Sequence, residues 1–222
     1  IFRYFAGLDM IKKNIQKGYK YARYVIYRET LIDRTEHFWS FIGAFFGIGI
    51  IAFLQSAYPE SDKLFLIGSF GASSVLLFGA IQSPLAQPRH LIGGHVISAL
   101  IGVSIQKIMP DILWLKVPLA VGLSIIGMQA TRTLHPPGGA TAMVAIIGSE
   151  KVKNLGYAFV ITPVLFGTLV LLLTALIFNN MTSKRKYPTE GRFSRGMKWI
   201  IRQFRKAIPT IFTAETPHNR KT

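Results

Sequence analysis

The sequence contains no cysteine, which excludes disulfides, thiolate catalysis and cysteine-based zinc or iron–sulfur sites. Acidic residues are scarce, with 10 Asp and Glu against 26 Lys and Arg. The long apolar stretches contain no carboxylate and the five histidines are scattered, so we expect neither a metal site nor a cofactor. No nucleophile is paired with a base and there is no phosphate-binding loop, so we expect that the protein is not an enzyme.

Half of the 222 residues are hydrophobic, and they are gathered into long runs. Runs of about 20 apolar residues match the ~30 Å hydrocarbon core of a bilayer. We therefore predict an all-α integral membrane protein with six hydrophobic segments, four of them long spans and two short or broken. The long spans are 38–58, 92–108, 112–134 and 157–178, and the short or broken segments are 64–81 and 139–148.

Basic residues concentrate at both ends of the chain. Residues 1–37 contain eight Lys or Arg, and residues 183–222 contain eleven against two acidic residues. Each end also has an apolar stripe at helical spacing, which predicts an amphipathic helix on anionic lipid headgroups. We thus expect a basic segment 1–37, a transmembrane domain 38–180 and a basic tail 181–222. Charge placed beside membrane spans favours lipid over nucleic acid as its partner.

The same charge pattern predicts the orientation in the membrane. Four crossings or six would both leave the two basic termini on one side, the cytoplasmic, matrix or stromal one. The chain begins at Ile1 and shows no signal peptide within its first thirty residues. We expect an organellar inner membrane, of a mitochondrion or chloroplast, with the termini in the matrix or stroma.

The most informative motif is the run His135-Pro136-Pro137-Gly138-Gly139-Ala140-Thr141-Ala142, set inside apolar sequence. Two prolines cannot continue a helix, so we predict that one helix ends near Leu134 and the next begins near Gly138. Backbone freed at membrane depth is tolerated only where protein or a water-filled cavity covers it. The break therefore predicts the wall of a polar site, with Arg132 and His135 beside it.

The two broken segments resemble each other. Gly71-Ala72-Ser73-Ser74 and Gly139-Ala140-Thr141-Ala142 each follow one long span and precede another. The chain thus reads as span, broken helix and span, twice. The two repeats are inverted if the broken pieces cross the membrane, and parallel if they are re-entrant. Matching interrupted segments in two halves are typical of the binding site of a transporter.

A small anion is the ligand that suits such helix starts. Unpaired N–H groups and the partial positive charge of a helix N-terminus attract anions, and hydroxyls add donors. The candidates in the two starts are Ser73, Ser74, Gly138, Gly139 and Thr141. Arg132 and Arg89 are the obvious counter-charges, although Arg132 could equally extend to the headgroups and Arg89 could be an ordinary loop charge.

Two histidines lie close to these segments. His135 could relay a proton or donate to an anion, or it could simply cap the interrupted helix. His95 lies beside Gly93-Gly94 and could face the same cavity or bond a backbone carbonyl.

Three blocks of residues together resemble the HPP family of integral membrane proteins. They are 68–79 (GSFGASSVLLFG), 83–95 (SPLAQPR, then GGH) and 131–142 (TRTLHPPGGATA). The resemblance implies a small multi-span membrane protein, and the family is thought to include transporters, with chloroplast members linked to nitrite movement. It implies site roles for the matching residues Gln87, Arg89, His95, Arg132 and His135. Family members often have Asn in place of His90 and Ala in place of Gly138.

Two functions follow as hypotheses. The first is transport of a small inorganic anion, nitrite or nitrate, between the N-termini of the broken helices. The second is a structural subunit of a larger organellar membrane complex, in which the HPP-type core serves as a scaffold and the basic ends bind partners. A homo-oligomer is compatible with both.

Overall fold

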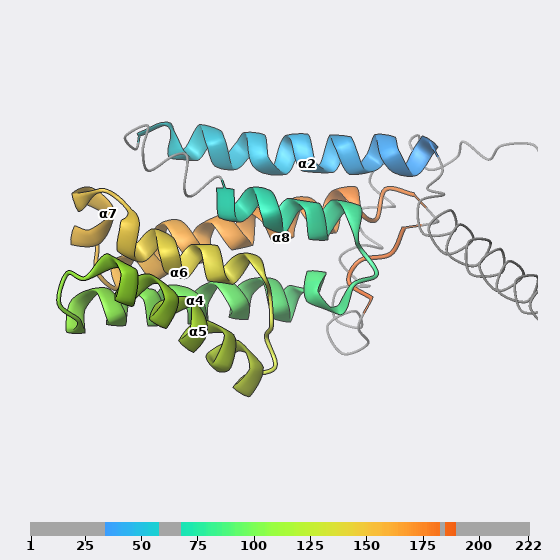
Figure 1. Cartoon of the computed structure of the whole chain (residues 1–222). Helices are drawn as coiled ribbons and strands as arrows, with labels where there is room; N and C mark the ends of the chain where they lie inside the picture. Colours follow the sequence, from blue (N-terminus) through green and yellow to red (C-terminus); the bar gives the residue numbers. More distant parts are fainter. Residues whose placement is uncertain (1–33, 58–67, 183–184, 190–222) are drawn as a thin grey trace, which may run out of the picture. The chain divides into compact units, whose positions relative to one another are not determined.

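The computed structural model describes residues 34–57, 68–182 and 185–189. The chain forms two compact units, 1–38 and 39–222, and the first is described only where its last residues begin α2 (Arg34–Leu54). Every regular element of the described residues is a helix (Figure 1). The predicted all-α class is therefore confirmed. The expected amphipathic terminal helices lie outside the described residues.

The described residues contain four helices long and apolar enough to cross a membrane and two shorter apolar ones. The long ones are α2, α4 (Pro88–Ile108), α5 (Leu113–Ala130) and the run Val160–Phe178, which joins the π-helix η4 (Val160–Leu165) to α8 (Phe166–Phe178). The short ones are the helix Gly68–Gly79, called the first short helix below, and α6 (Pro137–Ile147). The last residues of the first short helix form the π-helix η2 (Val75–Gly79). The remaining elements are the 3-10 helices η1 (Gln55–Ala57) and η3 (Pro84–Ala86) and the α-helix α7 (Glu150–Asn154).

Within residues 39–222, successive helices run in alternating directions, and the short helices take part in this alternation (Figure 1). At 11 residues, α6 is ~16 Å long, about half of a bilayer core. Each short helix thus follows one long helix and precedes another that runs in the same direction as the first (Figure 1). The three helices of the second half, long, short and long, each run opposite to the corresponding helix of the first half (Figure 1). Such directions are expected of an inverted repeat. The repeat itself stays a prediction.

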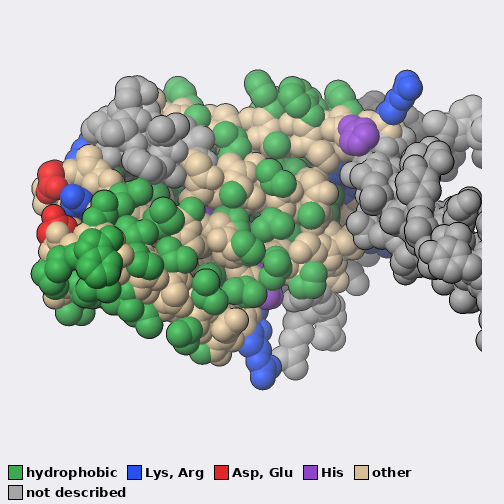
Figure 2. Space-filling model, viewed as in Figure 1, with side chains coloured by type: hydrophobic (Ala, Val, Ile, Leu, Met, Phe, Trp, Pro, Cys, Tyr) green, Lys and Arg blue, Asp and Glu red, His purple; other side chains and the backbone are tan. Residues whose placement is uncertain are grey.

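Helix α4 is the centre of the packing, because it contacts α5, α6, η4 and α8. Aliphatic and aromatic side chains fill the spaces between these helices and the first short helix. Large apolar side chains also point outward, as expected for contact with lipid; the most exposed include Phe41, Phe53, Trp114, Ile126 and Ile161. Figure 2 shows such side chains spread over the face in view, with acidic side chains gathered at one end.

The last span is interrupted, where the sequence predicted a continuous helix over 157–178. Pro163 has no N–H to donate and restricts the residue before it. Thr162 accordingly adopts an extended conformation, with φ −130° and ψ 116°, and regular α-helix resumes only at Phe166. Between the predicted segments 139–148 and 157–178, residues Glu150–Asn154 form the one-turn helix α7.

Two helix ends lie elsewhere than predicted. The first short helix already includes Gly68, so Gly71 and Ser74 lie inside it rather than at its N-terminus. Helix α5 ends at Ala130 rather than near Leu134. It closes before the prolines because the following turn has its own pair of hydrogen bonds, described below.

The segment after α8 closes the C-terminal end of the first short helix. Asn179 Nδ2 donates to Leu77 O at 2.7 Å, and Arg185 Nη2 donates to Phe78 O at 2.9 Å. Two residues further on, the buried Tyr187 hydroxyl donates to Ala86 O at 2.8 Å. Burial raises the pKa of the Tyr187 phenol, so this hydroxyl remains a donor. These bonds tie residues 185–187 to the helical core.

Candidate functional site

A buried row of hydroxyl and imidazole groups joins the two short helices to α4. We call Ser69, Ser73, His95, His135 and Thr141 the polar chain. Ser73 Oγ lies 2.8 Å from His95 Nε2 and 2.9 Å from His135 Nε2. His95 Nδ1 lies 2.7 Å from Thr141 Oγ1, which lies 3.2 Å from Ser69 Oγ. All five residues are buried, so the polar chain is enclosed by protein in this conformation.

The break at the two prolines places His135 in this chain. Pro137 is the first residue of α6, and the turn before it is closed by Gly138 N–H donating to His135 O at 2.8 Å. The start of α6 then lies against α4 at backbone distance. A Cβ on Gly94 would lie 2.3 Å from His135 Cβ, and one on Gly138 would lie 2.8 Å from Gly94 O. Glycine at both positions is what lets the imidazole reach Ser73.

The hydrogen-bond partners define which nitrogen of each ring carries a proton. His135 Nδ1 lies 2.8 Å from Leu85 O, and a carbonyl can only accept, so Nδ1 is protonated. In the neutral ring Nε2 then accepts from the Ser73 hydroxyl. Ser73 Oγ in turn accepts from His95 Nε2–H, and His95 Nδ1 accepts from the Thr141 hydroxyl. The single Thr141 proton then goes to His95 Nδ1 and not to Ser69 Oγ. With both rings neutral, each of the four ring nitrogens has a partner.

The structure brings four of the predicted site residues together, namely Ser73, His95, His135 and Thr141. Gly138 and Gly139 lie in the first turn of α6, as predicted. Ser74 is separate, because its hydroxyl donates to Gly71 O within its own helix at 2.7 Å. Gln87 braces the loop before α4, donating to Ile81 O and Ser83 O at 3.0 Å and accepting from Thr189 N–H at 2.8 Å.

Both arginines lie outside the polar chain. Arg89 is exposed, and its Nη2 donates to Thr131 O at 2.8 Å, at the end of α5. Arg132 is also exposed and is the one non-glycine residue with positive φ, 55°, among the described residues. The predicted counter-charges are thus at the surface, and Arg132 is three residues from the buried His135.

Arg132 occupies the position after α5 where glycine is usual. Its N–H donates to Gln129 O at 3.1 Å and the Thr133 N–H donates to Met128 O at 2.8 Å. This pair of bonds is the Schellman motif, whose left-handed residue is normally glycine. An L-residue in that conformation costs roughly 1–2 kcal/mol. The motif also explains why α5 ends before the prolines.

Sequence reasoning missed one member of the polar chain, Ser69. A signal was available, because Ser69 precedes Ser73 by four residues and the two therefore share one face of a helix. The carbonyl of Leu85 was not predictable in this way, since it reaches His135 from a turn 50 residues away.

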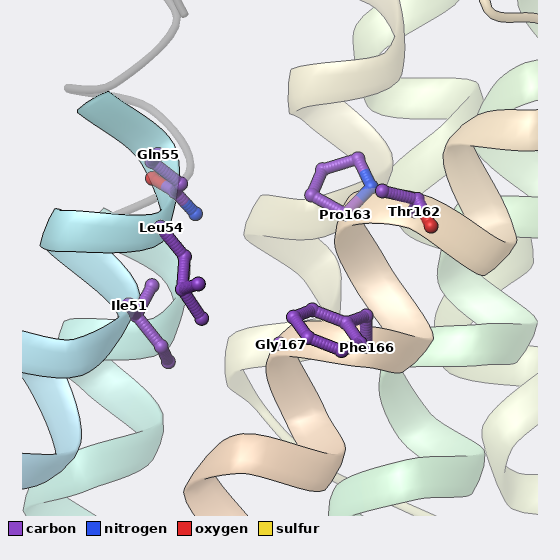
Figure 3. A pocket seen from close by; sticks show the side chains of 7 residues that line it. All are labelled: Ile51, Leu54, Gln55, Thr162, Pro163, Phe166 and Gly167. Atoms are coloured by element: carbon purple, nitrogen blue, oxygen red, sulfur yellow. The ribbon is translucent and has the colours of Figure 1, made fainter. Parts of the chain in front are cut away.

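A separate pocket of about 120 Å³ lies between α2 and the interrupted last span. Figure 3 shows Gln55, the first residue of η1, opposite Thr162 and Pro163 across this space. Its remaining lining is Ile51, Leu54, Phe166 and Gly167, so it is largely apolar and shares no residue with the polar chain. The sequence did not predict this pocket because the interruption at Pro163 was not expected.

Four membrane-length helices, two short helices between them and an enclosed polar chain define a multi-span membrane protein. The chain matches the family model "HPP, transmembrane region" over residues 29–188, and it belongs to the HPP family. The resemblance seen in the sequence is therefore confirmed.

Two similar proteins are transmembrane proteins of Dictyostelium discoideum. One is 44% identical over 160 residues, covering 70% of this chain and 51% of the relative. The other is 42% identical over 165 residues, covering 72% of this chain and 58% of the relative. The chain thus spans about half the length of these relatives. No solved structure matches the chain.

Proposed function

We propose that this protein transports a small inorganic anion across a membrane, at the place where the two short helices meet. The observation that carries the proposal is the buried polar chain, which joins both short helices to α4. Polar side chains at membrane depth are costly and usually serve a pathway. Short helices that meet at such groups are typical of transporter sites.

An anion fits this site better than a cation. The polar chain offers hydroxyl and imidazole N–H donors, and the first turn of α6 adds a partial positive charge. No carboxylate occurs in α4, in α6 or in the first short helix to hold a cation. Arg89 and Arg132, both exposed, attract anions to the surface close to His135. The preference for nitrite or nitrate rests on the resemblance to the family.

Anion flux into proteoliposomes containing the purified protein tests the proposal. Nitrate, nitrite and chloride are compared for the unaltered protein, for Ser73→Ala and for Ser124→Ala. Ser124 is the matched control, since its hydroxyl is buried on α5 and has no hydrogen-bond partner in the described part of the chain. We expect selective flux that Ser73→Ala abolishes and Ser124→Ala keeps. A folded protein without flux would refute the proposal.

A second candidate function is that of a structural subunit in a larger membrane complex. It is favoured by the basic tail, because eleven Lys and Arg in residues 183–222 exceed what a minimal carrier needs. Anionic lipids are the other partner that we propose for this tail. Size-exclusion chromatography after mild solubilisation separates the two, since a carrier elutes alone or as a small homo-oligomer and a subunit elutes with a much larger assembly.

The proposed location is an organellar inner membrane of a mitochondrion or chloroplast, with both termini in the matrix or stroma. The basic ends support this orientation. Protease protection of tags at each terminus, in isolated organelles, tests it, and cleavage from the outer side of the inner membrane would contradict it. We also propose that the protein acts without enzymatic activity or a cofactor.

A further inference from the structure

The polar chain can accept one additional proton without losing a hydrogen bond. The Ser73 hydroxyl has two acceptors within reach, His135 Nε2 at 2.9 Å and Ser69 O at 3.2 Å. When a proton binds His135 Nε2, that nitrogen donates to Ser73 Oγ and the Ser73 hydroxyl turns to Ser69 O. Leu85 O continues to accept from Nδ1. Ser73 is therefore the group that adapts to the protonation state of His135.

The surroundings of His135 provide no charge to balance that proton. From α4, the titratable or charged groups are His95, His90 on Leu134 O, the exposed Arg89 and Lys107 at the far end of the helix. On α5 there is Lys116, which is paired with Asp111, and after α5 there is the exposed Arg132. The segment after α8 has Arg185, which donates to Phe78 O, the exposed Lys186, and Tyr187, which donates to Ala86 O. The first short helix, η3 and α6 contain no titratable residue. A cationic His135 would thus be buried and unpaired, which is costly.

A bound anion has the same difficulty with the opposite sign. It too would be buried in a site whose groups are neutral, with both arginines at the surface. The two costs offset each other when both charges enter together, because a buried charge is tolerated when it is paired. Neither ion alone finds a counter-charge among the described residues around the polar chain.

Building on the proposed function, we infer that the polar chain binds a monovalent anion together with one proton, which His135 accepts at Nε2. The proton comes from the solution on one side and leaves with the anion on the other. The loaded site has gained one positive and one negative charge, so its net charge is unchanged. Transport is therefore electroneutral, with one proton for each anion.

Proteoliposomes loaded with a pH-sensitive dye test this coupling. Nitrate is the probe, because it is the anion of a strong acid and does not itself carry protons through lipid. The membrane potential is set with potassium and valinomycin. We expect a tenfold proton gradient, acid outside, to accumulate nitrate about tenfold, with the interior acidified in step and with no response to the potential. Nitrate flux that follows the potential and moves no protons would overturn the inference.

The variant His135→Asn tests whether His135 is the group that takes up the proton. Its side-chain amide can still donate to Leu85 O, as Nδ1 does, but it cannot take up a proton. We expect the nitrate accumulation ratio to fall to about 1, while Ser124→Ala keeps the tenfold ratio. If His135→Asn fails to fold, the dye measurement on the unaltered protein still decides. No flux of nitrate, nitrite or chloride by folded unaltered protein would refute the proposed function, whereas uncoupled nitrate flux would refute this inference alone.

Discussion

The imidazole rings of His95 and His135 lie with their centroids 5.0 Å apart, and the Ser73 hydroxyl is within hydrogen-bond distance of both. The three residues come from α4, from the turn before α6 and from the first short helix. One hydroxyl thus links three elements that are distant in the sequence. Its removal affects stability and the proposed transport together.

Replacing Ser73 by alanine should destabilise the protein by about 2 kcal/mol. The change leaves two buried nitrogens without partners, the Nε2 atoms of His95 and His135, and such groups cost about 1–3 kcal/mol each. Partial adjustment of the rings reduces the sum. Thermal unfolding in detergent measures the effect, with Ser124→Ala as the control that removes a buried hydroxyl having no partner. Equal melting temperatures for the two variants would contradict the hydrogen-bonding role of Ser73.

Adding a methyl group at Gly94 should also destabilise the protein, by about 1–3 kcal/mol, because the new Cβ would overlap the backbone-anchored His135. The closest contact would be 2.3 Å, to His135 Cβ. Gly122→Ala is the matched control, since a Cβ on that helical glycine meets nothing within 4 Å. We expect the control to be neutral or slightly stabilising, as alanine favours helix. If both variants unfold at the same temperature, the close approach of α4 and α6 is not as described.

Much of the fold could be predicted, because bilayer thickness constrains helix length and a pair of prolines ends a helix. The four long helices and the break before α6 follow from these two rules. The interruption at Thr162–Pro163 was also readable from the proline but was not predicted, since the surrounding residues are uniformly apolar. The left-handed Arg132 could not be predicted, because glycine is the residue usual at that position.

The site was predictable in composition and not in geometry. Residue types marked Ser73, His95, His135 and Thr141 as polar groups in apolar sequence, and the family resemblance supported both histidines. Their contacts span 22 to 62 residues of sequence, and a single sequence does not contain that information. The arginines were candidates for the ion site because of their charge and the family resemblance, with a place at the headgroups or in a loop as the alternative. The structure places both at the surface, where a guanidinium keeps its hydration.

Replacing Tyr187 by phenylalanine should weaken the attachment of the segment after α8. The variant leaves Ala86 O without the donor that now lies 2.8 Å away, and we expect a loss of about 1–2 kcal/mol. Tyr157→Phe is the control, because that tyrosine is 50% exposed and its hydroxyl meets Ser104 at the surface. Chemical denaturation in detergent compares them. A loss for Tyr157→Phe as large as that for Tyr187→Phe would argue against a specific role for Tyr187.

The same tyrosine predicts a difference at alkaline pH. Burial raises the pKa of Tyr187 in the folded protein, whereas an unfolded tyrosine ionises near its ordinary value of about 10. The stabilisation from the protonated phenol is therefore complete below pH ~10 and is lost as the pH rises above that value. We expect stability to fall less steeply between pH 10 and 11 in Tyr187→Phe than in the unaltered protein. Parallel curves would show that Tyr187 ionises equally in both states.

Replacing Arg132 by glycine should stabilise the protein and impair the proposed transport. Glycine relieves the cost of the left-handed conformation at φ 55°, so we expect a gain of about 1 kcal/mol. The exposed guanidinium is lost at the same time, which lowers the local concentration of anions. Arg132→Gln is the informative comparison, because it removes the charge and keeps the backbone strain. We expect both variants to reduce anion flux at low ionic strength and only the glycine variant to melt at a higher temperature. Unchanged flux in both would mean that this strained position is retained for a reason other than anion attraction.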